Sequence, residues 1–322
     1  MAECTQAREP STNGHPVRSQ TWIFAAGALV LLTAYSCAST GSAALSPAPP
    51  GAAPARQIIA ALKAYERRVG FAPTGNFARS SAAPLPGRCY YTGKLELPAS
   101  YRELRLRAVV DGRCDLDESE YDVFAYNLEV AATGRSPVTP ALEGAALERL
   151  LMVVPHEDFH NQPEMSAASA ESAEAAATLA GFIVAAGFAR EQYGAESAIA
   201  QRLAAEATLF WQKAAIVNDY AGRLDDLYRS YRAGAISREE SLDEKSRLFD
   251  ELMRACTAIE SAPVSFNRCP AVSNNAGLAF DRTYTREYTA LVDLEAQFSG
   301  NVEATVAALR WLFARGDPFV SR

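Results

Sequence analysis

The chain has 322 residues, which is enough for one large domain or for two coupled domains. Hydrophobic residues make up 49% and charged residues 21%, which is typical of a globular protein and excludes a largely disordered one. The formal charge is -7, and no run of basic residues breaks this acidic balance, so we expect no nucleic acid partner.

The N-terminal segment has the pattern of an export signal. An apolar run at residues 22–32 follows a polar opening with Arg8 and Arg18; it is short for a membrane span but suits a secretory signal. The run leads to Ala-Tyr-Ser-Cys, which ends at Cys37 and resembles the bacterial lipobox, where a peptidase cuts before a cysteine that then carries a lipid. Simple cleavage further along the chain and an uncleaved anchor remain as alternatives. We therefore predict a signal peptide at residues 1–36, lipid attachment at Cys37, and an exported protein held at the membrane in the periplasm or cell envelope.

The organisation beyond the predicted signal follows from composition and periodicity. Ala, Ser, Pro and Gly dominate residues 37–55, which predicts a flexible tether. An amphipathic helix is expected at residues 56–68, and turn-forming residues predict a loop at residues 71–87. We assign residues 56–145 to a mixed N-terminal part and residues 146–316 to a helical core.

Apart from Cys37, four cysteines remain in the predicted mature chain, and an oxidising compartment favours disulfides. Four cysteines allow three pairings, and proximity favours Cys89–Cys114 and Cys256–Cys269. Each bridge would contribute about 3 kcal/mol by restricting the unfolded chain. The rival interpretation, a metal–thiolate site, has no C-x-x-C spacing to support it.

Between residues 88 and 130, stretches that mix β-forming and helix-forming residues predict one or two strands. The rest of the chain has mostly helical patterns. Residues 140–154 predict a helix that leads into the next motif, and residues 172–194 predict an Ala-rich helix that is apolar on most sides and therefore buried. The fold class we expect is mainly α, with a small β contribution in residues 88–130.

A seven-residue repeat marks the clearest helix. Apolar side chains recur from Leu203 to Tyr231, and small or aromatic residues flank them one turn away, which predicts the buried face of a long helix. Its aromatic members fit core packing far better than a cofactor site. Ser237, with Glu240 three residues later, predicts a capping box that opens the next helix. Two more helices are expected near the C-terminus, at residues 286–298 and 302–313.

The sequence HEDFH at residues 156–160 carries the clearest chemistry. On a helix, His156 and His160 lie on one face a turn apart, so both imidazoles can reach one metal ion. Glu157 points beside that face, where it can contact a metal-bound water without being a ligand. Zinc lowers the pKa of such a water to about 7, and the glutamate can take its proton.

Two neighbours depart from what this motif usually shows. Pro155 precedes the first histidine, so it either lies inside a helix, where it removes a hydrogen bond, or occupies the first turn of a new helix. Asp158 is polar where such motifs often carry an apolar residue. The alternative interpretation is a capped helix start with two surface histidines, because H-E-x-x-H also occurs by chance.

A third ligand has to be a carboxylate, because the only other histidine, His15, lies ahead of the tether. Glu164 is one turn beyond the motif but follows a proline, whereas Glu171 and Glu174 open the Ala-rich helix. We favour Glu174, because the small residues after it let this helix pack closely on the histidine helix. Two histidines and a glutamate with an open fourth position are typical of catalytic zinc. The alternative for Glu174 is a first-turn glutamate favoured by the helix dipole.

These motifs resemble a bacterial family of predicted zinc aminopeptidases. That family carries H-E-x-x-H followed by N-E-x-x-A-T-x-x-G, and here HEDFH is followed by AEAAATLAG, with Ala173 in place of the asparagine. An L-x-x-L-Y segment at residues 224–228 and an N-N-A-x-L…T-Y block at residues 274–284 extend the similarity. The resemblance covers residues 150–312 and is weak at residues 56–144.

The resemblance implies a gluzincin-like helical core that acts on peptide or protein substrates and holds one Zn²⁺ ion, with a glutamate as the base. By position, the ligands would be His156, His160 and Glu174, and the base Glu157. Tyr284 would either donate a hydrogen bond to the oxyanion of peptide hydrolysis or only pack in the core. Asn274 and Asn275 would cap the following helix and support the metal ligands indirectly.

The expected function is therefore an exported zinc metallopeptidase, with aminopeptidase action implied by the resemblance. The runner-up is a catalytically degenerate relative that serves as an envelope binding or scaffold lipoprotein, because Pro155, Asp158 and Ala173 depart from the pattern. A helical lipoprotein without a metal is the third interpretation.

Overall fold

The computed structural model describes residues 54–320 except 110–112, 132 and 260–271. All described residues belong to one compact unit, which spans Ala43–Arg322. The predicted signal peptide, the lipid attachment at Cys37 and nearly all of the tether at residues 37–55 lie outside the described part of the chain.

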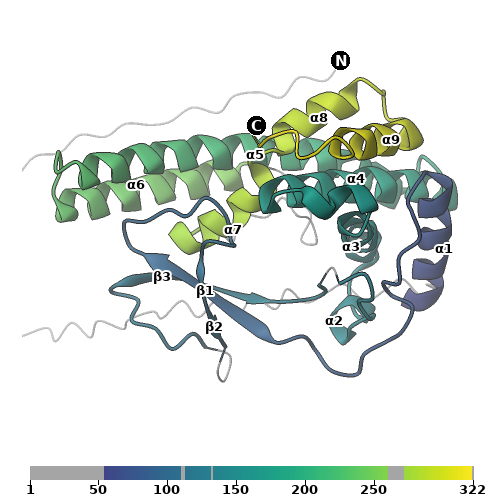
Figure 1. Ribbon diagram of the computed structural model, residues 1–322, viewed down its shortest axis with the longest axis horizontal. Helices are drawn as coiled ribbons and strands as arrows, with labels where there is room; N and C mark the ends of the chain where they lie inside the picture. Colours follow the sequence, from purple (N-terminus) through teal and green to yellow (C-terminus); the bar gives the residue numbers. More distant parts are fainter. Residues whose placement is uncertain (1–53, 110–112, 132, 260–271, 321–322) are drawn as a thin grey trace, which may run out of the picture. The chain divides into compact units, whose positions relative to one another are not determined.

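The described chain is mainly helical, as predicted, with a small three-stranded sheet. β1 (Gly87–Gly93) lies between β2 (Arg105–Ala108) and β3 (Tyr121–Asn127), and both pairings are antiparallel (Figure 1). The register places Tyr90 opposite Leu106 and Phe124. The prediction of one or two strands was too low, because β2 has only four residues, all exposed, and such a segment carries little sequence signal.

The predicted disulfide between Cys89 and Cys114 is present, with 5.7 Å between the Cα atoms. It ties the central strand to the connection between β2 and β3. Cys256 is buried, whereas Cys269 lies outside the described residues, so their pairing stays a prediction.

Two helices cover the region in which one was predicted at residues 140–154. α2 (Pro140–Glu143) is capped by the hydroxyl of Thr139 and ends at Gly144. α3 (Leu147–His160) then runs through Pro155 to the second histidine, so the proline lies in the helix interior rather than in the first turn of a new helix. α1 (Ala55–Arg68) packs against α3 and begins the described fold.

A short 3-10 helix, η1 (Pro163–Ala167), leads from α3 to α4 (Ala170–Tyr193). α4 is buried along most of its length, as its apolar sequence predicts. Its length and hydropathy would also suit a membrane span, but 89% of its apolar window is buried inside the fold. The apolar character of α4 is therefore accounted for by its place in the core.

The remaining helices pack around α4 and the sheet. α5 (Ala198–Arg232) and α6 (Arg238–Thr257) form a long antiparallel hairpin, and α7 (Asn275–Thr285) contacts both α5 and the sheet (Figure 1). α8 (Tyr288–Ala296) and α9 (Val302–Phe313) pack on α4.

The seven-residue repeat and the capping box both appear in this hairpin. Along α5, the first four members of the repeat are buried, and Tyr228 rather than Tyr231 is the last buried aromatic residue. The capping box of Ser237 and Glu240 opens α6, as predicted. Apolar packing between the buried faces of α5 and α6 therefore holds the hairpin together.

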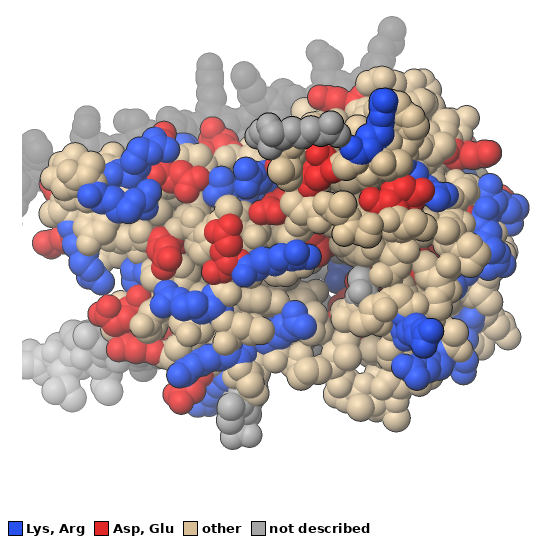
Figure 2. Space-filling view, viewed as in Figure 1, with Lys and Arg blue, Asp and Glu red and all other residues tan. Residues whose placement is uncertain are grey.

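Charged side chains of both signs are interspersed on the face of the molecule shown in Figure 2. Ion pairs also form between helices, such as Arg223 of α5 with Glu251 of α6 at 2.8 Å. Exposed pairs of this kind contribute about 0–1 kcal/mol each, so the surface charges add little to the packing of the core.

Candidate metal centre

The three side chains predicted as metal ligands converge in the structure. His156 and His160 come from α3, and Glu174 comes from the second turn of α4. The Nε2 atoms of the two histidines are 3.1 Å apart. Oε2 of Glu174 lies 3.0 Å from Nε2 of His160 and 3.3 Å from Nε2 of His156. The three atoms form a nearly equilateral triangle.

The size of this triangle fits a metal ion with tetrahedral coordination. Zinc binds imidazole nitrogen and carboxylate oxygen at about 2.0–2.2 Å, so neighbouring ligand atoms of a tetrahedral site lie about 3.3–3.5 Å apart. The observed separations of 3.0 to 3.3 Å are slightly shorter. A small outward movement of the side chains would admit the ion, and a fourth position would stay open for water or substrate. The group could therefore hold a metal ion.

A glycine lets α3 and α4 approach each other at the level of the ligands. A Cβ atom at Gly181 would lie 2.9 Å from the carbonyl oxygen of Met152 and 3.3 Å from Cβ of His156. Any side chain at this position would push α4 away from α3. Gly181 follows Glu174 by two helical turns and so lies on the same face of α4. The E-x-x-A-T-x-x-G pattern thus contains both a ligand and the residue that allows the ligand's helix to pack.

The charges of the predicted ligands stabilise one another. Burial by itself raises the pKa of Glu174, but His160 and His156 lower it, and the resulting pKa lies below the usual value. Burial lowers the pKa of His160, and the carboxylates of Glu174 and Glu157 reverse this effect and raise it. Glu174 is therefore ionised at neutral pH, as a metal ligand has to be.

Glu157 flanks the cluster and is half-buried. Burial raises the pKa of its carboxyl group; His156 and His160 oppose this change, while Glu174 and Asp158 add to it. A carboxylate with a raised pKa accepts a proton more readily than an ordinary glutamate. The position and the pKa of Glu157 both suit a general base.

Three tyrosines border the cluster. The ring of Tyr284, from α7, stacks on the ring of His156 with 6.3 Å between the centroids. The hydroxyl of Tyr101 donates to Oε1 of Glu174 at 3.2 Å. Tyr126, at the end of β3, packs on Phe280 of α7 with 4.8 Å between the ring centroids. Burial raises the pKa of all three tyrosines, so each keeps its proton and can donate a hydrogen bond at neutral pH.

The sequence pointed to Tyr284 but not to Tyr101 or Tyr126. Tyr101 lies in a turn between β1 and β2, where no periodicity marks a functional residue. Its backbone N–H donates to the hydroxyl of Thr283 at 2.9 Å, which fixes the turn beside α7. In the T-Y block, Tyr284 therefore faces the cluster, and Thr283 holds Tyr101 near it.

The two predicted supporting asparagines lie away from the ligands. Asn274 caps α7 by accepting the N–H of Gly277 at 3.0 Å, as predicted. Asn275 is buried, donates to the carbonyl oxygen of Lys94 at 2.9 Å and accepts the Tyr228 hydroxyl at 2.7 Å. These partners surround the first turn of α7, whereas Tyr284 lies near the other end, roughly 15 Å along the helix. The asparagines therefore stabilise α7 and do not contact the metal ligands.

The other carboxylates considered as third ligands have different partners. Glu164 pairs with Arg310 of α9 at 2.8 Å, and Glu171 lies 4.0 Å from Arg286. Among the described residues, Glu174 is the carboxylate that completes the group with the two histidines.

No protein-family model matches the chain, and no curated protein and no solved structure matches it. The resemblance to the predicted zinc aminopeptidases therefore depends on the sequence motifs alone. Independently of any family, two imidazoles and a carboxylate with a second carboxylate beside them suit metal-assisted hydrolysis.

Proposed function

We propose that this protein is an exported zinc metallopeptidase that hydrolyses peptide bonds with Glu157 as the general base. The observation that carries the proposal is the ligand triangle of His156, His160 and Glu174, with Glu157 beside it. A structural zinc site usually has four protein ligands, whereas three ligands and a free position are typical of catalysis. Aminopeptidase specificity is proposed from the family resemblance.

Each residue of the site has a separate role in this proposal. Bound zinc would act as a Lewis acid that lowers the pKa of water to about 7 and polarises the substrate carbonyl. Glu157 takes the proton of the attacking water and delivers it to the leaving amine. Tyr284 keeps its proton at neutral pH and can donate to the developing oxyanion. Tyr101 holds one carboxylate oxygen of Glu174 and leaves the other for the metal.

The proposed location depends on the N-terminal sequence. We propose export and lipid attachment at Cys37, so the wild type should incorporate a labelled fatty acid and a Cys37→Ser variant should not. A wild type that incorporated no fatty acid would favour the uncleaved anchor or simple cleavage.

The proposed reaction is tested by the metal content and peptide hydrolysis of the purified full-length protein. Glu157→Gln should keep about one zinc ion per chain and lower kcat by about 10³-fold, because a positioned base contributes about 10²- to 10⁴-fold. Glu164→Gln is the matched control, because this glutamate pairs with Arg310 outside the cluster and should change neither quantity.

Undiminished hydrolysis by Glu157→Gln would refute the proposed mechanism. Stoichiometric zinc without cleavage of any peptide in a diverse library would instead support the degenerate relative.

A further inference from the structure

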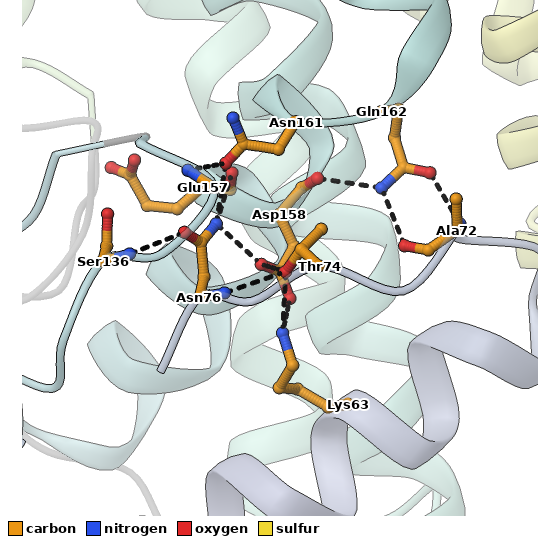
Figure 3. Close-up of polar contacts among 10 residues, drawn as sticks. Lys63, Ala72, Thr74, Asn76, Ser136, Glu157, Asp158, Asn161 and Gln162 are labelled. Carbon is orange, nitrogen blue, oxygen red and sulfur yellow. Dashed lines mark hydrogen bonds and ion pairs between the residues drawn. The ribbon is translucent and has the colours of Figure 1, made fainter. Parts of the chain in front are cut away.

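The side of α3 that faces away from the metal ligands carries a second set of buried polar contacts (Figure 3). Asp158 lies there, two residues from each histidine, and is 1% exposed. Its carboxylate pairs with Lys63 of α1, accepts the hydroxyl of Thr74 at 2.5 Å and accepts the amide of Asn76 at 2.9 Å. The polar residue that departs from the usual motif thus binds the segment that follows α1.

Asn76 is the centre of these contacts and is fully buried. Its Nδ2 atom donates to Oδ1 of Asp158 at 2.9 Å and to Oδ1 of Asn161 at 2.8 Å, and it lies 3.3 Å from the carbonyl oxygen of Glu157. Its Oδ1 atom accepts the N–H of Ser136 at 2.9 Å. One side chain therefore connects the turn of α3 that carries Glu157 with the segment around Ser136 (Figure 3).

Further contacts join the two segments that meet at Asn76. The N–H of Gly134 donates to Oδ1 of Asn161 at 3.0 Å. A Cβ atom at Gly75 would lie 2.7 Å from the carbonyl oxygen of Gly134, so the backbones approach as closely as a glycine allows. Ser80 and Val138 pair as a parallel bridge. Residues 72–81 and 133–138 thus form one unit that is docked on the end of α3.

The chain that leads to this unit contacts both α7 and α3. It starts at Tyr126, whose ring packs on α7 next to Tyr284. It continues through Glu129, which pairs with Arg149 of α3 at 2.8 Å. It is fixed at Ser136 by Asn76. The connection between β3 and α2 is therefore anchored at two points, at Glu129 on α3 and at Ser136 on Asn76.

We propose that Asn76 is a positioning residue that sets the place of Glu157 relative to the metal ligands through its contacts with the last turn of α3. This inference rests on the proposed function. The ligands are fixed by one another and by the metal, but Glu157 is no ligand and depends on the backbone that Asn76 holds. A displacement of about 1 Å can cost a reaction about 100-fold.

The test compares Asn76→Ala with Leu252→Ala in the full-length protein. Leu252 is fully buried between α5 and α6, and its truncation costs about 2–5 kcal/mol without touching α3. We expect Asn76→Ala to keep its zinc and to lose about tenfold or more in kcat. Leu252→Ala should keep kcat and KM within about twofold of the wild type. Asn161→Ala removes only one of the bonds of Asn76 and the tie to Gly134, so it is the milder variant and should lose less kcat than Asn76→Ala.

Hydrogen exchange measured by mass spectrometry reports on the same coupling without activity. Asn76→Ala should speed exchange in residues 72–81 and 133–138 but not in α6, and Leu252→Ala should do the reverse. A zinc-loaded Asn76→Ala protein with unchanged kcat, or an equal loss of kcat in Leu252→Ala, would overturn the positioning role while leaving the proposed function intact. A wild-type protein that binds zinc and cleaves no peptide would refute the proposed function, and the positioning role with it.

Discussion

Buried clusters of charged side chains lie near the two ends of α7, and they differ in how their charges are matched. At the first turn, the carboxylate of Asp122 meets Lys245 at 2.5 Å, Lys94 at 3.0 Å and the N–H of Asn275 at 2.9 Å. Near the last turn, by contrast, the two histidines and the glutamate of the ligand triangle bring three potential metal-binding atoms together.

The first cluster is complete without a ligand, because its carboxylate has donors from α6, from α7 and from the turn after β1. In the second cluster, two imidazole nitrogens and a carboxylate oxygen lie within 3.3 Å of one another, and such an arrangement is favourable only with a proton or a cation between them. Burial of charge alone therefore does not identify a functional site. The convergence of three potential ligand atoms is the more informative observation.

The largest effect is expected from removing the carboxylate of the triangle. Glu174→Ala should weaken zinc binding by about 100-fold or more, because only two imidazoles remain as ligands. Competition with a chelator of known affinity measures this change. Equal zinc affinity in the variant would show that the triangle is not the metal site.

Removing the carboxylate of the other cluster, at the first turn of α7, should affect stability instead of zinc binding. Asp122→Ala leaves Lys245 buried without its carboxylate, and breaking a buried pair in this way costs about 3–5 kcal/mol. Denaturant unfolding of the metal-free protein measures the loss. Zinc affinity, measured on the fraction that folds, should stay unchanged, and a large decrease would mean that the two clusters are coupled through α7.

A smaller effect, on both stability and zinc binding, is expected from a substitution at the contact between α3 and α4. Gly181→Ala should destabilise the fold by about 1–3 kcal/mol through overpacking and should weaken zinc binding about tenfold, because Glu174 moves with α4. Gly222→Ala in α5 is the control, since a Cβ there meets no atom within 4 Å and alanine favours the helix. If both variants bound zinc like the wild type, the close approach would not matter for the ligand geometry.

The smallest effect should come from the tyrosine that holds the glutamate. Tyr101→Phe removes one hydrogen bond to Glu174 and keeps the ring, so stability should change by about 1 kcal/mol at most. Zinc affinity should fall about tenfold, which is typical for partners that orient a ligand. An unchanged affinity would mean that the buried ligands need no help from the hydroxyl group.

The sequence predicts the elements whose signal is periodic and local. The histidine spacing, the apolar helix that carries Glu174 and the stripe on α5 each depend on a pattern within one element, and each is confirmed as a structural feature. The break at Gly144 and the short strand β2 have no such pattern, and both were missed. Pro155 remained ambiguous because tertiary packing, rather than propensity, decides whether a helix continues through proline.

Contacts between segments that are far apart in the sequence could not be predicted. Tyr101 reaches Glu174 across 73 positions, and Asn76 reaches Asp158 across 82. Neither Tyr101 nor Asn76 lies in a recognisable motif, so only the folded structure reveals their partners. Asp158 is a further example. In the sequence it only departs from the usual motif, whereas in the structure three partners from the N-terminal segment explain why this position is polar.

The spacing of these contacts also suggests an order of assembly. His160 and Glu174 are 14 positions apart, whereas the bond between Asn76 and Asp158 closes a loop of 82 positions. Contacts between near neighbours in the sequence form with less loss of chain entropy, so the hairpin of α3 and α4 should fold before residues 72–81 dock on it. Under the proposed function, a newly exported chain would then be able to capture a metal ion while Glu157 is still loosely placed. Hydrolysis would begin only after the last segment has docked, which would protect a half-folded molecule from cutting its neighbours or itself.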